Sequence, residues 1–124
     1  MRTDTLLRSL RDALDESVLL AKVNGLAATY LAAFEPSHPL RFLANTKAAL
    51  RKEIEIGNQR GWFVNREESQ QGVTTISARF RWTSSTYIVT VAGPTSRVAP
   101  KLEKAAELIT NVCNLLGTSK QTDL

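Results

Sequence analysis

Residues 61–80, GWFVNREESQQGVTTISARF, and residues 87–97, YIVTVAGPTSR, form the stretch of sequence that decides the fold. Apolar side chains recur at every second position from Ile76 to Trp82, which is the period of a strand with one buried face. Residues 73–82 therefore predict one strand of a β-hairpin. Residues 86–92 predict the other, around a turn of Thr and Ser at residues 83–85. The Gly-Pro corner that follows directs the chain toward a final helix.

The chain before this stretch predicts a helix and a second hairpin. Asp4 is a suitable N-cap for a helix whose leucines recur at three- and four-residue spacing. Residues 17–23 and 26–34 predict two strands. Asn24-Gly25 joins them and favours a tight hairpin turn, because both residue types tolerate positive φ. The N-terminal part thus predicts the order helix, strand, strand.

Two more helices and a short strand complete the expected order. A loop with two prolines at residues 35–39 precedes a helix expected at residues 47–59, and residues 62–64 predict a short strand. The last helix is expected to begin near Pro100 and to end at Gly117.

The order α-β-β-α-β-β-β-α predicts an α+β fold, with a single antiparallel sheet and packed helices. A chain of 124 residues, 43% of them hydrophobic and 23% charged, suits one soluble domain with one core. We expect this domain to span residues 1–117 and residues 118–124 to be a polar tail. The apolar runs are far shorter than the ~20 residues that cross a bilayer.

The charge and the single cysteine limit the function classes. The formal net charge of +4 could indicate nucleic-acid binding, but the basic residues are spread out, with one tight group at Lys47, Arg51 and Lys52. We expect a solvated surface and no nucleic-acid binding by this chain. One cysteine cannot form an intrachain disulfide, and no signal-peptide core is present, so we expect a cytoplasmic protein.

His38 and Cys113 are the residue types that most often bind metals or attack substrates. One histidine in a proline-flanked loop and one distant cysteine do not make a metal site, which needs several converging ligands. Cys113 falls on the apolar face of the last helix, where a free cysteine behaves as a small hydrophobic residue. No metal and no cofactor are expected.

Acidic clusters are the remaining candidates for acid-base catalysis. Glu67-Glu68 lies in a turn, and Asp12, Asp15 and Glu16 lie at a helix end, where exposed carboxylates are common. The glutamate pair is a candidate cap for the turn that precedes residue 73. Because neither set forms a catalytic constellation, the sequence does not predict an enzyme.

The aromatic residues allow two interpretations. Trp62, Phe80, Trp82 and Tyr87 either fill the core between sheet and helices or stack bases, and the first is the more common role. Trp82 is placed at a hairpin tip, so an exposed Trp82 and Tyr87 would mark a partner surface.

The decisive stretch resembles the effector-binding domain of the IclR family of bacterial transcription regulators. The family pattern is present as Gly61-Trp62, Phe63-Val64, the acidic turn with Glu67-Glu68, Gly72, and the corner AGPTSR at residues 92–97. The likeness extends over nearly the whole chain and implies a GAF-like fold. We expect two departures from the family pattern: no winged helix-turn-helix before the domain, and a shortened pocket-capping segment after Phe42.

The resemblance also implies a ligand site. The family's pocket holds a small carboxylate or aromatic acid, and its polar positions correspond here to Asn65, Thr75, Thr90 and Ala92. The first three retain hydrogen-bonding groups, and Ala92 does not. The resemblance thus implies a stand-alone regulatory module that senses a small organic acid or modulates a regulator by forming homo- or hetero-oligomers. The alternative is a protein-interaction or structural subunit with a degenerate pocket.

Overall fold

The computed structural model describes residues 2–25, 27–36, 62–67 and 71–118. The elements follow in the order α1 Arg2–Leu14, β1 Ser17–Asn24, β2 Ala27–Phe34, β3 Trp62–Arg66, β4 Val73–Trp82, β5 Ser85–Pro94, α3 Thr95–Val98, the 3-10 turn η1 Ala99–Lys101, and α4 Leu102–Thr118. The helix expected at residues 47–59 lies outside the described residues, as do residues 37–39 of the proline-containing loop.

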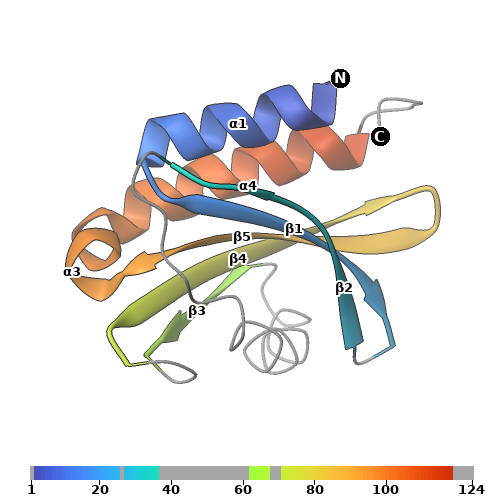
Figure 1. Cartoon of the computed structure of the whole chain (residues 1–124). Helices are drawn as coiled ribbons and strands as arrows, with labels where there is room; N and C mark the ends of the chain where they lie inside the picture. The colour runs from blue at the N-terminus through green and yellow to red at the C-terminus, as the bar shows by residue number, and fades with distance from the viewer. Residues whose placement is uncertain (1, 26, 37–61, 68–70, 119–124) are drawn as a thin grey trace.

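The strands form one five-stranded sheet in the order β2-β1-β5-β4-β3. Every neighbouring pair is antiparallel, and β4 pairs with β5 along its whole length, from Val73 opposite Pro94 to Trp82 opposite Ser85. Helices α1 and α4 lie side by side along one face of this sheet (Figure 1). The structure thus confirms the predicted α+β fold with a single antiparallel sheet. It also confirms both hairpins.

The main core lies between this sheet face and the two long helices. Residues at three- and four-residue spacing on α1 and α4 meet alternate residues of the strands, as the sequence periods require. The buried members are Leu7, Leu10, Leu14, Val18, Leu20, Phe34, Ile76, Ala78, Phe80, Tyr87, Val89, Val91, Ala105, Ile109, Cys113 and Leu116. The alternation predicted for β4 is therefore confirmed, with Trp82 half-buried at its end.

The ends of the helices differ from the sequence-based expectation. Helix α1 begins at Arg2, so Asp4 lies within the first turn instead of capping it, where a carboxylate still favours the positive end of the helix dipole. After the Gly-Pro corner the chain is helical from Thr95, and Pro100 lies in the 3-10 turn that leads into α4. Gly117 lies inside the last turn of α4 rather than ending it.

The hairpin between β4 and β5 has a shorter turn than the sequence indicated. Ser85 pairs with Trp82, which leaves a two-residue turn of Thr83 and Ser84. Both residues have positive φ, 49° and 71°. Such turns match the right-handed twist of the strands, but side chains with a Cβ adopt positive φ at a cost.

Ser84→Gly is accordingly expected to raise the free energy of unfolding by about 0.5 to 1 kcal/mol, because glycine adopts positive φ without a steric penalty. Urea unfolding would measure the change. Ser96→Gly is the matched control, since Ser96 is exposed and lies in α3 with no positive φ. That variant should be neutral or destabilising, and an equal effect at both positions would contradict the turn argument.

Candidate functional site

The four residues of the predicted ligand site lie on one face of the sheet, opposite the face that packs against α1 and α4. Asn65 on β3 is opposite Thr75 on β4, and Thr75 is opposite Ala92 on β5. Thr90 lies two positions before Ala92 on the same strand, so it shares this face. All four are buried, with 6% or less of each residue exposed. The structure therefore brings these positions together across three adjacent strands.

Two polar residues that the sequence analysis did not select share this face. Ser77 lies two positions after Thr75 and pairs with Thr90, and the two hydroxyl oxygens are 2.7 Å apart. Ser17 on β1 pairs with Ala92. The signal that could have identified Ser77 is the two-residue strand period, which places it beside Thr75. Ser17 required the strand order, which brings β1 next to β5.

The arrangement concentrates buried hydroxyl and amide groups at the centre of the sheet. Burying such groups costs free energy unless they form hydrogen bonds, so a sheet face built only for packing favours apolar side chains. Here apolar residues such as Leu19 and Phe63 flank the polar ones. Hydroxyl and amide groups do not titrate near neutral pH. The polar residues of this face are therefore suited to hydrogen bonding and not to proton transfer; they are Ser17, Asn65, Thr75, Ser77 and Thr90.

A second cluster surrounds Glu16, at the junction of α1 and β1. The Arg97 guanidinium donates two hydrogen bonds to the Glu16 carboxylate, at 2.9 and 2.8 Å. Lys101 Nζ lies 3.1 Å from the same carboxylate and donates a hydrogen bond to the carbonyl oxygen of Leu14 at 2.6 Å. The Glu16 side chain is only 1% exposed. The expectation of an exposed carboxylate at this helix end is wrong for Glu16, because these two cations bury it.

The Glu16 cluster explains why residue 93, in the corner between β5 and α3, is a glycine. A Cβ atom on Gly93 would lie 2.8 Å from Cδ of Glu16, closer still to Oε1, and 3.0 Å from Cγ2 of Val98. The hydrogen bond to Glu16 raises the pKa of Arg97 above its ordinary value. The Glu16 cluster therefore holds the corner between β5 and α3 against the start of β1, and its role is structural.

The acidic turn is closed by its own residues. Gly72 N–H donates to Oε1 of Glu67 at 2.8 Å, and Glu67 N–H donates to the carbonyl oxygen of Val73 at 2.9 Å. Thr95 N–H in turn donates to the carbonyl oxygen of Gly72 at 2.8 Å. The predicted capping role is thus confirmed for Glu67, and Glu68 lies outside the described residues.

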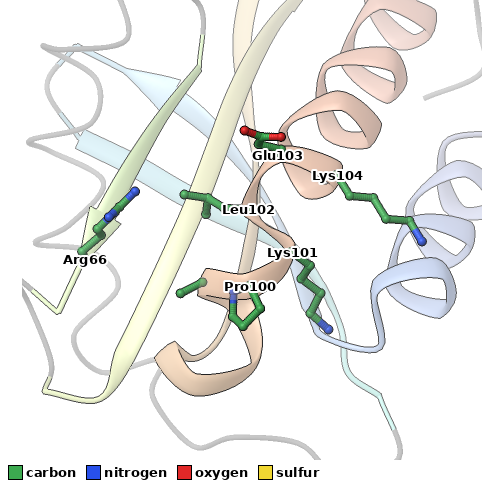
Figure 2. Close-up of a pocket in the computed structure, with 7 residues that line it drawn as sticks. Arg66, Pro100, Lys101, Leu102, Glu103 and Lys104 are labelled. Carbon is green, nitrogen blue, oxygen red and sulfur yellow. The ribbon is translucent and has the colours of Figure 1, made fainter.

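An open groove of about 570 Å³ lies between Arg66 and the start of α4. Its lining includes three cationic side chains, from Arg66, Lys101 and Lys104, and one carboxylate, from Glu103. Figure 2 shows that Lys101 and Lys104 extend away from Arg66. Lys101 is already bound to Glu16 and Leu14. The groove therefore lacks the convergent charges of an anion site.

The other candidates from the sequence have structural positions or lie outside the described residues. Cys113 is buried, and burial raises its pKa to about 12, so it remains a thiol in the core as predicted. Tyr87 is also buried and stacks on Phe80 with ring centroids 5.3 Å apart, and Trp82 is half-buried against the core, so the favoured role in core packing is confirmed. The position of His38 is outside the described residues.

The described part of the chain contains no group of three or more His, Cys, Asp or Glu side chains placed to hold a metal ion. No helix within it is long and apolar enough to cross a membrane.

Comparison with known proteins gives two kinds of match. A family model, bacterial transcriptional regulator IclR C-terminal, matches residues 41–114. Among solved structures, the effector domain of IclR from Acinetobacter sp. ADP1 is 16% identical, with a TM-score of 0.75 and coverage of 96% of both chains. The C-terminal domain of a Vibrio cholerae protein assigned as a transcriptional regulator is 18% identical, with a TM-score of 0.73, and the match covers 92% of this chain and 93% of that one.

The chain also matches IclR of Thermotoga maritima, at 15% identity and a TM-score of 0.74, over 93% of this chain and 65% of that one. Comparison with curated protein sequences gave no match. At these identities the structural likeness bears on the fold alone.

Proposed function

We propose that this chain, which belongs to the bacterial transcriptional regulator IclR C-terminal family, is a regulatory module that binds a small organic acid. The binding site would be the polar sheet face of Asn65, Thr75 and Thr90, with Ala92 as its apolar member. The observation that supports this most is the placement of these residues together, buried, on the face opposite the helices. Hydroxyl and amide hydrogens can donate to a carboxylate, which only accepts.

We also propose that the module acts by association, as a homo-oligomer or with a related regulator, and does not bind DNA itself. Signals from a bound acid would reach a regulator through such contacts. The alternative, a structural subunit with a degenerate pocket, rests on the missing hydroxyl at Ala92. Light scattering of the purified chain, alone and with a related regulator, would test the association.

The ligand proposal is tested by thermal shift with a panel of small carboxylates and aromatic acids. A ligand that binds only the folded state raises apparent stability by ~2.7 kcal/mol at a hundredfold excess over its dissociation constant. We expect at least one acid to raise the Tm of the native protein. Thr75→Val should abolish that shift, because it removes the hydroxyl and keeps the shape.

Thr74→Val is the matched control. Thr74 precedes Thr75 on the same strand and is also buried, but it faces the other way and bonds to the Thr95 hydroxyl at 2.8 Å. This variant should keep the ligand-induced shift, even if its own Tm is lower. Absence of a shift across the panel would contradict the ligand proposal and leave the structural alternative.

A further inference from the structure

Ser77 and Thr90 form a buried hydroxyl pair at the centre of the sheet. Thr90 lies on β5, the middle strand of the five, and Ser77 lies opposite it on β4. Their hydroxyl oxygens are 2.7 Å apart, either can be the donor, and neither residue is more than 1% exposed. This pair joins two side chains of the polar face into one hydrogen-bonded unit.

The direction of that hydrogen bond decides what Thr90 can offer to a ligand. A hydroxyl has one hydrogen to donate and two lone pairs that accept. If Ser77 donates to Thr90, the Thr90 hydrogen is free to donate to a ligand. If Thr90 donates to Ser77, its hydrogen is used and only lone pairs remain. An ionised carboxylate has no hydrogen to donate, so it can bind Thr90 only in the first state.

We propose that Ser77 is a positioning residue for ligand binding, which orients and polarises the Thr90 hydroxyl so that Thr90 donates to an oxyanion. This role of Ser77 rests on the proposed function, which did not include Ser77. Accepting a hydrogen bond from Ser77 makes the Thr90 hydroxyl a better donor, because successive hydrogen bonds polarise one another. The site therefore favours carboxylates over uncharged analogues of the same shape, such as primary amides.

The test is a double-mutant cycle on ligand affinity, measured by calorimetry with benzoate and succinate, each beside its primary amide. The cycle compares the native protein with Ser77→Ala, Thr90→Val and the double variant. We expect Ser77→Ala to weaken carboxylate binding about two- to threefold, since the bond from Thr90 to the carboxylate remains but loses its polarisation by Ser77. Amide binding should weaken much less. In the Thr90→Val background, Ser77→Ala should cause no further loss, because Ser77 acts through Thr90.

Three results would overturn the inference. Losses that multiply in the double variant would mean that Ser77 acts independently of Thr90. An equal loss for acid and amide would indicate a structural role alone. Unchanged carboxylate binding in Ser77→Ala, with binding lost in Thr75→Val, would overturn this inference and leave the proposed function intact. If no acid binds the native protein, the proposed function fails as well.

The ligand-free Tm of each variant separates binding effects from folding effects. Ser77→Cys serves as a second variant if Ser77→Ala does not fold, because it keeps the number of side-chain heavy atoms and replaces a strong donor by a weak one. It should reduce the preference for acid over amide without reducing the ligand-free Tm by more than a few degrees. An unchanged preference in Ser77→Cys would also overturn the inference.

Discussion

Gly93→Ala is expected to lower the free energy of unfolding by about 3 kcal/mol, the upper part of the range for forcing extra atoms into a packed site. The added Cβ would lie 2.8 Å from Cδ of Glu16, so the buried carboxylate would have to leave its position between Arg97 and Lys101. The backbone of Gly93 does not have the positive φ that favours glycine. The cost is therefore steric and electrostatic, and a fall in Tm of roughly 10 °C would measure it.

Gly117→Ala is the matched control for this substitution. A Cβ on Gly117 would meet its nearest neighbours at 3.5 Å, an ordinary van der Waals contact, and the residue lies in α4. Alanine favours helix over glycine by roughly 0.5 to 1 kcal/mol, so this variant should be neutral or more stable.

Repeating Gly93→Ala in the Glu16→Ala variant shows how much of its cost comes from the clash with the Glu16 carboxylate. In Glu16→Ala, the substitution Gly93→Ala should cost less than in the native protein, because the two closest contacts of the added Cβ, both with Glu16, are removed. Equal costs in the two backgrounds would show that Glu16 is not the reason for the glycine.

Local patterns predicted the sheet well because strands and hairpins have local signals. The alternation from Ile76 to Trp82 gave β4 its correct bounds, and Asn24-Gly25 placed the first hairpin turn, with Gly25 at a φ of 65°. The two-residue turn at Thr83 and Ser84 was missed because neither residue type is typical of positive φ. The more common role, packing in the core, was favoured for Tyr87, and the pairing places it opposite Phe80 in the core.

The sequence predicted which residues of the candidate site lie together, but not the hydrogen bonds and ion pairs that they form. The resemblance and the strand period together placed Asn65, Thr75, Thr90 and Ala92, which the structure brings onto one face. The Ser77–Thr90 bond depends on the register between β4 and β5, and the two-residue turn shifts that register by one residue from the one that the expected three-residue turn would give. The burial of Glu16 depends on Arg97, which lies 81 residues later in the chain. Such long-range contacts are decided by packing, so the sequence indicated an exposed carboxylate instead.

Arg97→Ala is expected to lower the free energy of unfolding by about 2 to 3 kcal/mol, at or below the lower end of the range for breaking a buried ion pair. The variant would leave the Glu16 carboxylate buried without its two guanidinium hydrogen bonds. The loss is moderated because Lys101 still contacts the carboxylate, and because the Arg97 side chain is itself 39% exposed. Urea unfolding measures the change.

Two companion variants distinguish this geometry from charge alone. Arg97→Lys keeps the charge but cannot form two parallel hydrogen bonds, so it should recover only part of the stability. Arg11→Ala removes an arginine whose partner Asp12 is 68% exposed, at a similar distance of 2.9 Å. An exposed pair contributes about 0 to 1 kcal/mol, so this variant should be close to the native protein. Equal losses of unfolding free energy in Arg11→Ala and Arg97→Ala would mean that the burial of Glu16 does not determine how much its ion pair with Arg97 stabilises the protein. Full recovery by Arg97→Lys would show that the net charge, and not the paired hydrogen bonds, holds the β5–α3 corner to β1.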